Sequence, residues 1–232
     1  FIDNSSIDRT VDILKGIAVI LMIIFHFYYF PNQYGFTEIE YDTTLLKLIA
    51  KIAQIIFITC VGINLVFAKN KNSDAKIHLQ RVMKIAFYAL LMSIFTYYVF
   101  KEKYVKFGIL HFVAFSSLVL FAFVDNVEAM KIITAIVFLV YLLNHYKPDL
   151  FKIIPQPFAF IGGFYNDRYS AIDHFPIIPW ILLICLGTFI GNHLVTKNID
   201  TPSFLNNNES DSQYLPCFLA ASSARIAVFE FP

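Results

Sequence analysis

The chain consists of long hydrophobic runs separated by polar segments. Between Gly16 and Thr37 there is no Asp, Glu, Lys or Arg. At about 1.5 Å per residue, a helix of this length crosses the roughly 30 Å hydrocarbon core of a bilayer. Five further apolar runs extend over Leu45 to Ala68, Val82 to Phe100, Phe107 to Val124, Ala129 to Tyr146 and Ile177 to Val195. The pattern predicts an all-α polytopic membrane protein, a transmembrane helix bundle of about six spans.

The polar segments predict how the chain is divided. Most connections between the apolar runs are short, but residues 147–176 form a long one that contains Pro and Gly. A connection of this length in a compact bundle is usually functional, and we expect it on the outer side, before the last span. Beyond Val195 the composition changes to Asn, Ser and Asp. We therefore predict a transmembrane domain over residues 1–195 and a polar, disordered or atypical tail over residues 196–232.

Composition supports the membrane interpretation and excludes other classes. Hydrophobic residues make up 58% of the 232 residues, the mean hydropathy is +0.63, and only 15% of residues are charged, against roughly 25% in soluble domains. The net charge of +1 gives no basis for nucleic-acid binding. Cys60 and Cys185 lie in apolar runs and Cys217 lies in the tail, which is neither a disulfide framework nor a zinc pattern. We therefore expect the protein to be surrounded by membrane lipid.

Charge in the connections predicts the orientation. The first connection, Pro31 to Thr44, carries only acidic charges. The region between the second and third spans carries five basic residues, Lys69, Lys71, Lys76, Arg81 and Lys84. Because basic connections stay in the cytoplasm, we predict a cytoplasmic N-terminus in a plasma or inner membrane. The three lysines between Lys101 and Lys106 then lie outside, against the rule.

An ionisable side chain lies within the first span. His26 follows ten residues that carry no charge, and such a group in a membrane is a functional candidate by default. Its alternative role is a hydrogen-bonded histidine in an interfacial aromatic belt with Tyr28 and Tyr29. In the predicted topology, His26, His111, Asp173 and His174 all lie toward the outer face.

Three blocks of sequence carry a resemblance to a known family. The first is R-x-x-D-x-L-K-G-I-A from Arg9, with F-H-F around His26; the others are F-G-I-L-H-F at Phe107 to Phe112 and D-H-F-P-I-I-P-W-I-L-L-I-C-L-G at Asp173 to Gly187. Together they resemble the heparan-alpha-glucosaminide N-acetyltransferase catalytic-domain family, especially its short bacterial-type relatives. The spacing from Lys15 to His26 is also similar to the Arg-to-His spacing in the first helix of the acyltransferase-3 family. Lys15 keeps the charge of that Arg but lacks its planar bidentate fork.

The resemblance implies an activity. It implies an integral membrane acyltransferase that moves an acetyl or other acyl group from cytosolic acyl-CoA to a carbohydrate or glycolipid acceptor on the outer face. Acetyl-CoA is then the co-substrate. No metal is required, because the thioester is already activated, and no metal-ligand spacing is seen in the sequence.

The resemblance also assigns candidate catalytic roles to the residues predicted toward the outer face. His26 is the candidate general base, because an imidazole exchanges protons near neutral pH. His111 binds the acceptor or only packs at the interface. Asp173, beside His174, orients a base, contacts sugar hydroxyls, or caps a helix.

Four basic residues are candidates for binding the phosphates of CoA, and each pair has an alternative role. Arg9 and Lys15 are the stronger candidates for the CoA phosphates, and Arg81 and Lys84 are the weaker ones. Snorkelling of Arg9 and Lys15 to lipid headgroups is the alternative for the first pair. A topology signal is the alternative for the second pair.

Two other functional classes stay open at this point. In a small transporter, the histidines and Asp173 would line a proton or solute path, although the sequence shows no inverted repeat. The other class is a structural membrane subunit without catalysis. Transfer of labelled acetyl from acetyl-CoA distinguishes the enzyme from both.

Overall fold

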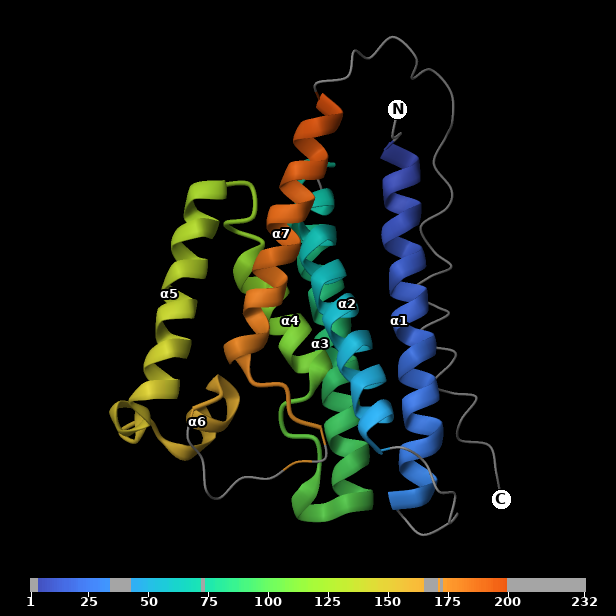
Figure 1. The fold of residues 1–232 in the computed structure, drawn as a ribbon, viewed down its shortest axis with the longest axis vertical. Helices are drawn as coiled ribbons and strands as arrows, with labels where there is room; N and C mark the ends of the chain where they lie inside the picture. Colours follow the sequence, from blue (N-terminus) through green and yellow to red (C-terminus); the bar gives the residue numbers. More distant parts are fainter. Residues whose placement is uncertain (1–3, 34–42, 72–73, 165–170, 172, 200–232) are drawn as a thin grey trace. The chain divides into compact units, whose positions relative to one another are not determined.

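The computed structural model describes residues 4–33, 43–71, 74–164, 171 and 173–199, and these residues are largely helical. The elements are α1 (Asn4–Gln33), α2 (Thr43–Asn70), α3 (Ala75–Phe100), η1 (Lys101–Lys103), α4 (Ile109–Leu120), α5 (Val127–Tyr146), η2 (Pro148–Phe151), α6 (Gln156–Gly162) and α7 (Ile177–Ile199) (Figure 1). Within the described ranges the only β-type pairing is an isolated bridge between Phe107 and His174. The prediction of an all-α polytopic bundle is confirmed.

Five of the described helices are long and apolar enough to cross a membrane, namely Arg9–Tyr29, Thr44–Asn70, Ala75–Lys103, Val127–Tyr146 and Ile177–Thr196. The remaining predicted span, Phe107 to Val124, is helical only over Ile109–Leu120. Twelve residues rise about 18 Å, which is shorter than the hydrocarbon core. The chain is therefore a multi-pass membrane protein in which one apolar helix is shorter than a full span.

The chain forms two compact units. The first unit contains residues 1–57 and 196–232, and the second contains residues 58–195. In the first unit, α1 carries Arg9, Lys15 and His26. The predicted tail, residues 196–232, lies outside the described residues from residue 200 onward.

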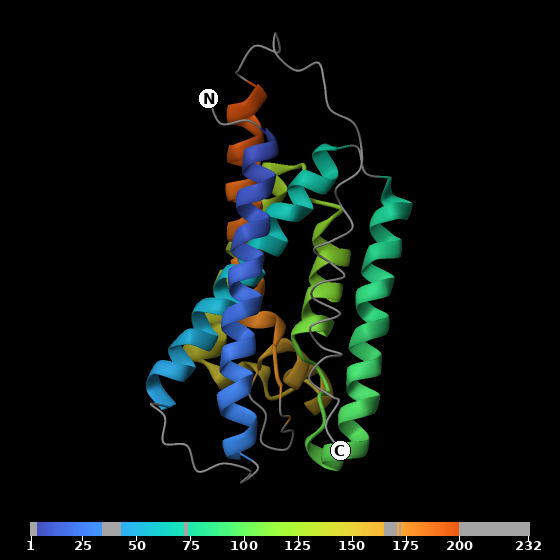
Figure 2. The ribbon, with the colours of Figure 1, turned by 90° about the vertical axis from the view of Figure 1, so that its right-hand side faces the viewer.

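In the second unit α4 is the most deeply buried helix. Its buried residues are Phe112, Val113, Ala114, Ser116, Ser117 and Leu120. Figure 2 shows α3 beside α4, and the two helices are in contact. A helix that is covered on several sides by protein gives fixed positions to the groups at its N-terminus. The candidate site lies at that end.

Small residues allow α2 and α7 to approach closely. A Cβ atom added to Gly187 would collide with the carbonyl oxygen of Thr59, and one added to Gly62 would collide with that of Ile184. One turn further along α7, a Cβ atom on Gly191 would lie 3.0 Å from the side chain of Val66. Such close backbone contact is how membrane helices gain packing energy, because lipid tails are as apolar as the helices themselves.

We expect Gly187→Ala to destabilise the second unit. In an open helix this change is favourable by about 1 kcal/mol, but here the new methyl meets backbone and must separate α2 from α7, at a cost of about 1–3 kcal/mol. The measurement is the Tm of the purified protein in detergent. Gly16→Ala is the matched control, because no atom lies within 4 Å of a Cβ atom at that position. Equal Tm values for the two variants would contradict the packing argument.

Candidate functional site

The N-terminus of α4 is joined to a short segment that precedes α7, Asp173 to Phe175, which we call the strap. Oδ2 of Asp173 accepts a hydrogen bond from the backbone N–H of Ile109 at 3.2 Å. The backbone N–H of Phe175 donates to the carbonyl oxygen of Phe107 at 2.9 Å. The strap thus holds the α3–α4 connection through groups that lie more than sixty residues apart in the sequence.

The Asp173 contact satisfies a requirement of α4. The first N–H groups of a helix have no partner inside the helix, and Gly108, the residue before α4, has no side chain with which to cap them. The carboxylate of Asp173 supplies the cap from another part of the chain, and its charge also suits the positive end of the helix dipole. A Cβ atom on Gly108 would collide with this carboxylate. A side chain at position 108 would therefore displace this carboxylate from its contact with Ile109.

His111 is held by two hydrogen bonds in the first turn of α4. The hydroxyl of Ser93 donates to the carbonyl oxygen of Val105 at 2.6 Å, so Ser93 accepts from Nε2 of His111, 3.2 Å away. Nδ1 of His111 then accepts from the N–H of Gly108 at 3.4 Å. The network assigns the neutral tautomer with its proton on Nε2. In this arrangement the ring fastens α4 to α3 and to the connection between them.

His174 connects the strap to α6. Its Nε2 donates to the carbonyl oxygen of Phe160 at 2.8 Å, and its ring stacks on Phe160 with 3.8 Å between centroids. At the end of α6, Nδ2 of Asn144 on α5 donates to the carbonyl oxygen of Gly163 at 3.1 Å. The strap therefore joins α4 to α6, and α6 is joined in turn to α5. Because Nε2 of His174 is the donor, Nδ1 carries the lone pair in its neutral ring.

His26 lies in the first unit, on α1. Its Nδ1 donates to the carbonyl oxygen of Met22, one turn earlier, at 2.7 Å. A hydrogen bond from Nδ1 to a backbone carbonyl fixes the tautomer and the orientation of the ring. The nitrogen that can take a proton is then Nε2. The predicted convergence of His26 with His111, Asp173 and His174 joins residues of two units and stays a prediction.

The candidate phosphate-binding cations occupy two helices. On α1, Nζ of Lys15 pairs with Oδ1 of Asp12 at 2.6 Å, and Arg9 is exposed. On α3, Arg81 and Lys84 are exposed near the start of the helix. Arg81 is twelve residues, or about 18 Å of helix rise, from Ser93. The structure thus brings His111, Asp173 and His174 together and places Arg81 and Lys84 toward the opposite end of α3.

Comparison of the chain with known proteins identifies its family. The family profile described as heparan-alpha-glucosaminide N-acetyltransferase, catalytic, matches residues 8–229. The chain belongs to this family. No curated protein and no solved structure matches the chain. The match includes the three blocks that carried the resemblance, so the heparan-alpha-glucosaminide N-acetyltransferase family assignment is confirmed, and with it the assignment of the chain to a family of membrane acetyltransferases.

Family resemblance pointed to His111, Asp173 and His174 but not to the residues that hold them. Ser93 and Asn144 fix His111 and α6 through the bonds described above, and nothing in their sequence context distinguishes them from other polar residues of apolar helices. The carbonyl oxygens Oδ1 of Asn144 and Oε1 of Gln156 are buried and have no hydrogen-bond partner among the described residues. Buried acceptors of this kind are rare and call for a donor. Gln156 lies on α6, to which His174 is bonded, and Asn144 lies on α5, which is bonded to the end of α6.

A second histidine cluster lies at the opposite end of α4 and is built around His78, which the sequence did not single out. His78 is buried and contacts the carbonyl oxygen of Ser117 at 3.1 Å. Its ring stacks on Phe121 with 3.7 Å between centroids. Nζ of Lys69 lies 4.9 Å from the centroid of Phe121 and 3.5 Å from Oδ2 of Asp125. The sequence feature that could have indicated this cluster is a histidine, His78, inside a basic stretch.

No group of three or more His, Cys, Asp or Glu side chains is arranged to hold a metal ion in the part of the chain that the structure describes. The strap and the groups joined to it offer helix-capping, imidazole and amide groups instead. We call this set the strap cluster; it consists of His111, Asn144, Asp173 and His174. These groups are suited to proton transfer and to hydrogen bonding with hydroxyl or amine groups.

Proposed function

We propose that the protein transfers an acetyl group from cytosolic acetyl-CoA to an amine or hydroxyl of a carbohydrate or glycolipid acceptor on the outer face of the membrane. One observation carries the proposal: the family match contains the blocks of His26, His111 and Asp173–His174, and the fold joins the last two blocks in one hydrogen-bonded cluster. Residues that are distant in sequence are thereby held at one place.

His26 is the proposed general base. Bound acetyl-CoA supplies an activated thioester carbonyl, and attack on it requires that the acceptor's amine or hydroxyl lose a proton. With Nδ1 bonded to Met22, Nε2 of His26 takes that proton. The backbone contact holds the ring in one orientation, which preserves the alignment that the reaction needs.

The strap cluster is the proposed site for the acceptor. Amines and sugar hydroxyls are hydrogen-bond donors, and the cluster presents acceptors for them: Nδ1 of His174, and the carbonyl oxygens of Asn144 and Gln156 that are buried without a partner among the described residues. A buried acceptor that finds a donor only in the bound substrate favours substrates that carry that donor. Asp173 and His111 act through position, because the hydrogen bonds described above hold the start of α4.

The cations are the proposed contacts for the CoA phosphates. Arg9 and Lys15 lie on the same helix as His26, and Lys15 is eleven residues from it, about 16 Å of rise. Although Lys15 pairs with Asp12, an ammonium group has three N–H donors, so this pairing is compatible with a phosphate contact. Arg81 and Lys84 on α3 are exposed cations of the same kind. The residues present therefore fit an anionic co-substrate.

The test is incubation of the purified full chain in detergent with acetyl-CoA labelled in its acetyl group. The acceptor probes are glucosamine and a lipid extract from membranes that contain the protein. We expect labelled acetyl to appear on one of these acceptors with release of an equal amount of CoA. A sample without protein is the control. If neither CoA release nor a labelled product exceeds this control, the proposal is overturned.

The orientation is tested by cysteine labelling. In a background with Cys217→Ser, a cysteine at Lys71 or at Glu102 provides an exposed reporter at either end of α3, while Cys60 and Cys185 are buried. An impermeant maleimide added to intact cells should label the Glu102 position, and the Lys71 position only after the membrane is opened. Labelling of both positions from one side would contradict the predicted topology.

A further inference from the structure

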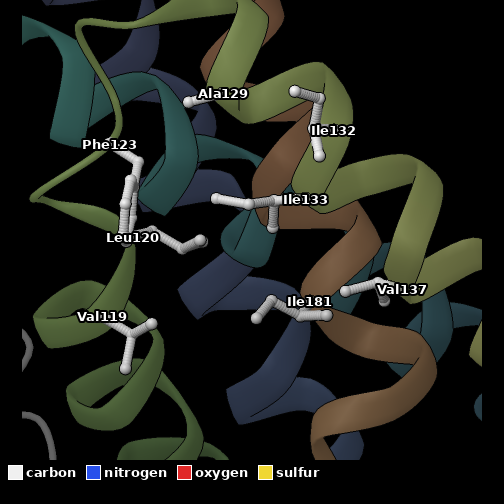
Figure 3. Close-up of a pocket in the computed structure, with 8 residues that line it drawn as sticks. All are labelled: Val119, Leu120, Phe123, Ala129, Ile132, Ile133, Val137 and Ile181. Atoms are coloured by element: carbon white, nitrogen blue, oxygen red, sulfur yellow. The ribbon is translucent and has the colours of Figure 1, made fainter.

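An apolar groove lies between α4, α5 and α7 in the second unit. Its volume is about 470 Å³, and its walls include Val119 and Leu120 of α4, Ala129, Ile133 and Val137 of α5, and Ile181 of α7. Figure 3 shows these side chains around one common space, with only carbon atoms drawn in them. The volume lies within the roughly 300–1,000 Å³ typical of ligand sites.

The groove interrupts the packing of α5. Over the twenty residues of α5 only Met130 is buried, whereas α4 buries half of its residues. Helices in a membrane are held together by van der Waals contact, and atoms that line an empty space lose those contacts on one side. An occupant of the groove would therefore supply contacts that α5 does not obtain from protein.

The position of the groove determines the chemistry of its occupant. It lies along a membrane-spanning helix, and two of its wall residues are well exposed, Val119 at 40% and Ile132 at 61%. It therefore opens onto the surface that faces lipid. An apolar lining offers no hydrogen bond to a polar ligand or to water. Hydrocarbon is both the available occupant and the one that fits.

The end of the groove at Ala129 indicates which hydrocarbon. The lining on α5 runs from Ala129 to Val137, eight steps along the helix or about 12 Å of rise. Directly beside Ala129, the start of α5 carries Glu128 and Lys131, exposed and paired at 2.7 Å. A polar rim at a helix end, followed by an apolar trough along the helix, matches a polar headgroup followed by an acyl chain.

We propose that the groove binds one acyl chain of a membrane glycerophospholipid, which fastens α5 to α4 and α7. The bound lipid is a structural component of the bundle. The inference does not depend on the acetyltransferase proposal, because the groove lies apart from the strap cluster and its lining has no group for proton transfer.

Photolabelling tests the proposal on the unmodified protein. The full chain is reconstituted in phosphatidylcholine vesicles that contain a trace of phosphatidylcholine with a diazirine on its acyl chain, then irradiated, and the labelled residues are identified by mass spectrometry. A bound chain labels Ile133 and Val137 in the groove in preference to Ile136 and Leu139, which lie outside the groove and are more exposed than Ile133 and Val137. Labelling in proportion to exposure would show only passing contact with bulk lipid and would overturn the proposal.

Filling the groove provides the second test. Ala129→Phe places a ring in the groove, and Val119→Phe does so from the opposite wall. Each should lose most of the label at Ile133 and Val137 and should no longer gain thermal stability when phosphatidylcholine is added in detergent. Ala135→Phe makes the same change at an exposed position of α5 that does not line the groove, and should behave as the parent does.

Other occupants give distinct outcomes. If residues 200–232 or a second copy of the chain cover the groove, a photoreactive residue placed at Val137 crosslinks to protein, and lipid label is absent from Ile133. Either result overturns the proposal. Equal loss of label in Ala129→Phe and Ala135→Phe would do the same, because the effect would then be independent of the groove.

Discussion

Replacing His26 with Gln is expected to lower acetyl-transfer turnover by about 10²-fold to 10⁴-fold, the range typical of a lost general base. The amide of Gln keeps an N–H that can donate to the carbonyl oxygen of Met22, as Nδ1 of His26 does. It has no nitrogen that takes a proton near neutral pH. The rate should therefore fall while the fold is kept. The measurement is kcat at saturating acetyl-CoA, together with the Tm in detergent.

His193→Gln is the matched control for this prediction. His193 is an exposed histidine on α7, and it has no assigned role in the proposed chemistry. Its replacement should leave kcat unchanged, so that any general effect of losing a histidine is accounted for. Near-normal turnover in His26→Gln would show that His26 only packs or hydrogen-bonds within α1.

Asp173→Ala is expected to have the second largest effect. It removes the hydrogen bond to the N–H of Ile109, and the loss of such a cap costs about 0.5–2 kcal/mol of stability. It also releases the strap that carries His174. Because small displacements of positioning groups reduce rates strongly, turnover should fall by on the order of 10²-fold. The measurements are the Tm and kcat of the same preparation.

The conservative variant distinguishes positioning from catalysis. Asp173→Asn keeps an oxygen that accepts from Ile109, so it should restore most of the stability and most of the rate. Asp149→Ala is the control, because Asp149 is an exposed aspartate that forms a surface pair with Lys152. A stable but slow Asp173→Asn would show that the negative charge itself is needed, and it would move Asp173 from a positioning role to a catalytic one.

The extent of α4 shows where the hydrophobic pattern stops being informative. The apolar run continues through Phe121 and Val124, and the sequence therefore predicted a span from Phe107 to Val124. In the structure the helix ends at Leu120. Val124 is buried, and its carbonyl oxygen accepts from Nδ2 of Asn192 at 3.2 Å, while Phe121 stacks on His78. These residues are apolar because they pack inside the protein, and hydropathy alone does not distinguish that from exposure to lipid.

The sequence by itself determined the membrane class and the family. Charge-free runs of bilayer length have few stable forms other than helices, because backbone groups need internal partners in lipid. Short motifs at His26, His111 and Asp173 identified the family and its candidate residues. Only the tertiary structure decided how those candidates are held. The bond from Asp173 to Ile109, the close approach at Gly108 and the bond from Ser93 to His111 depend on which helices pack together. That packing is set by shape, at contacts such as Gly62 against Ile184, and shape complementarity between distant segments leaves no periodic signal in the sequence.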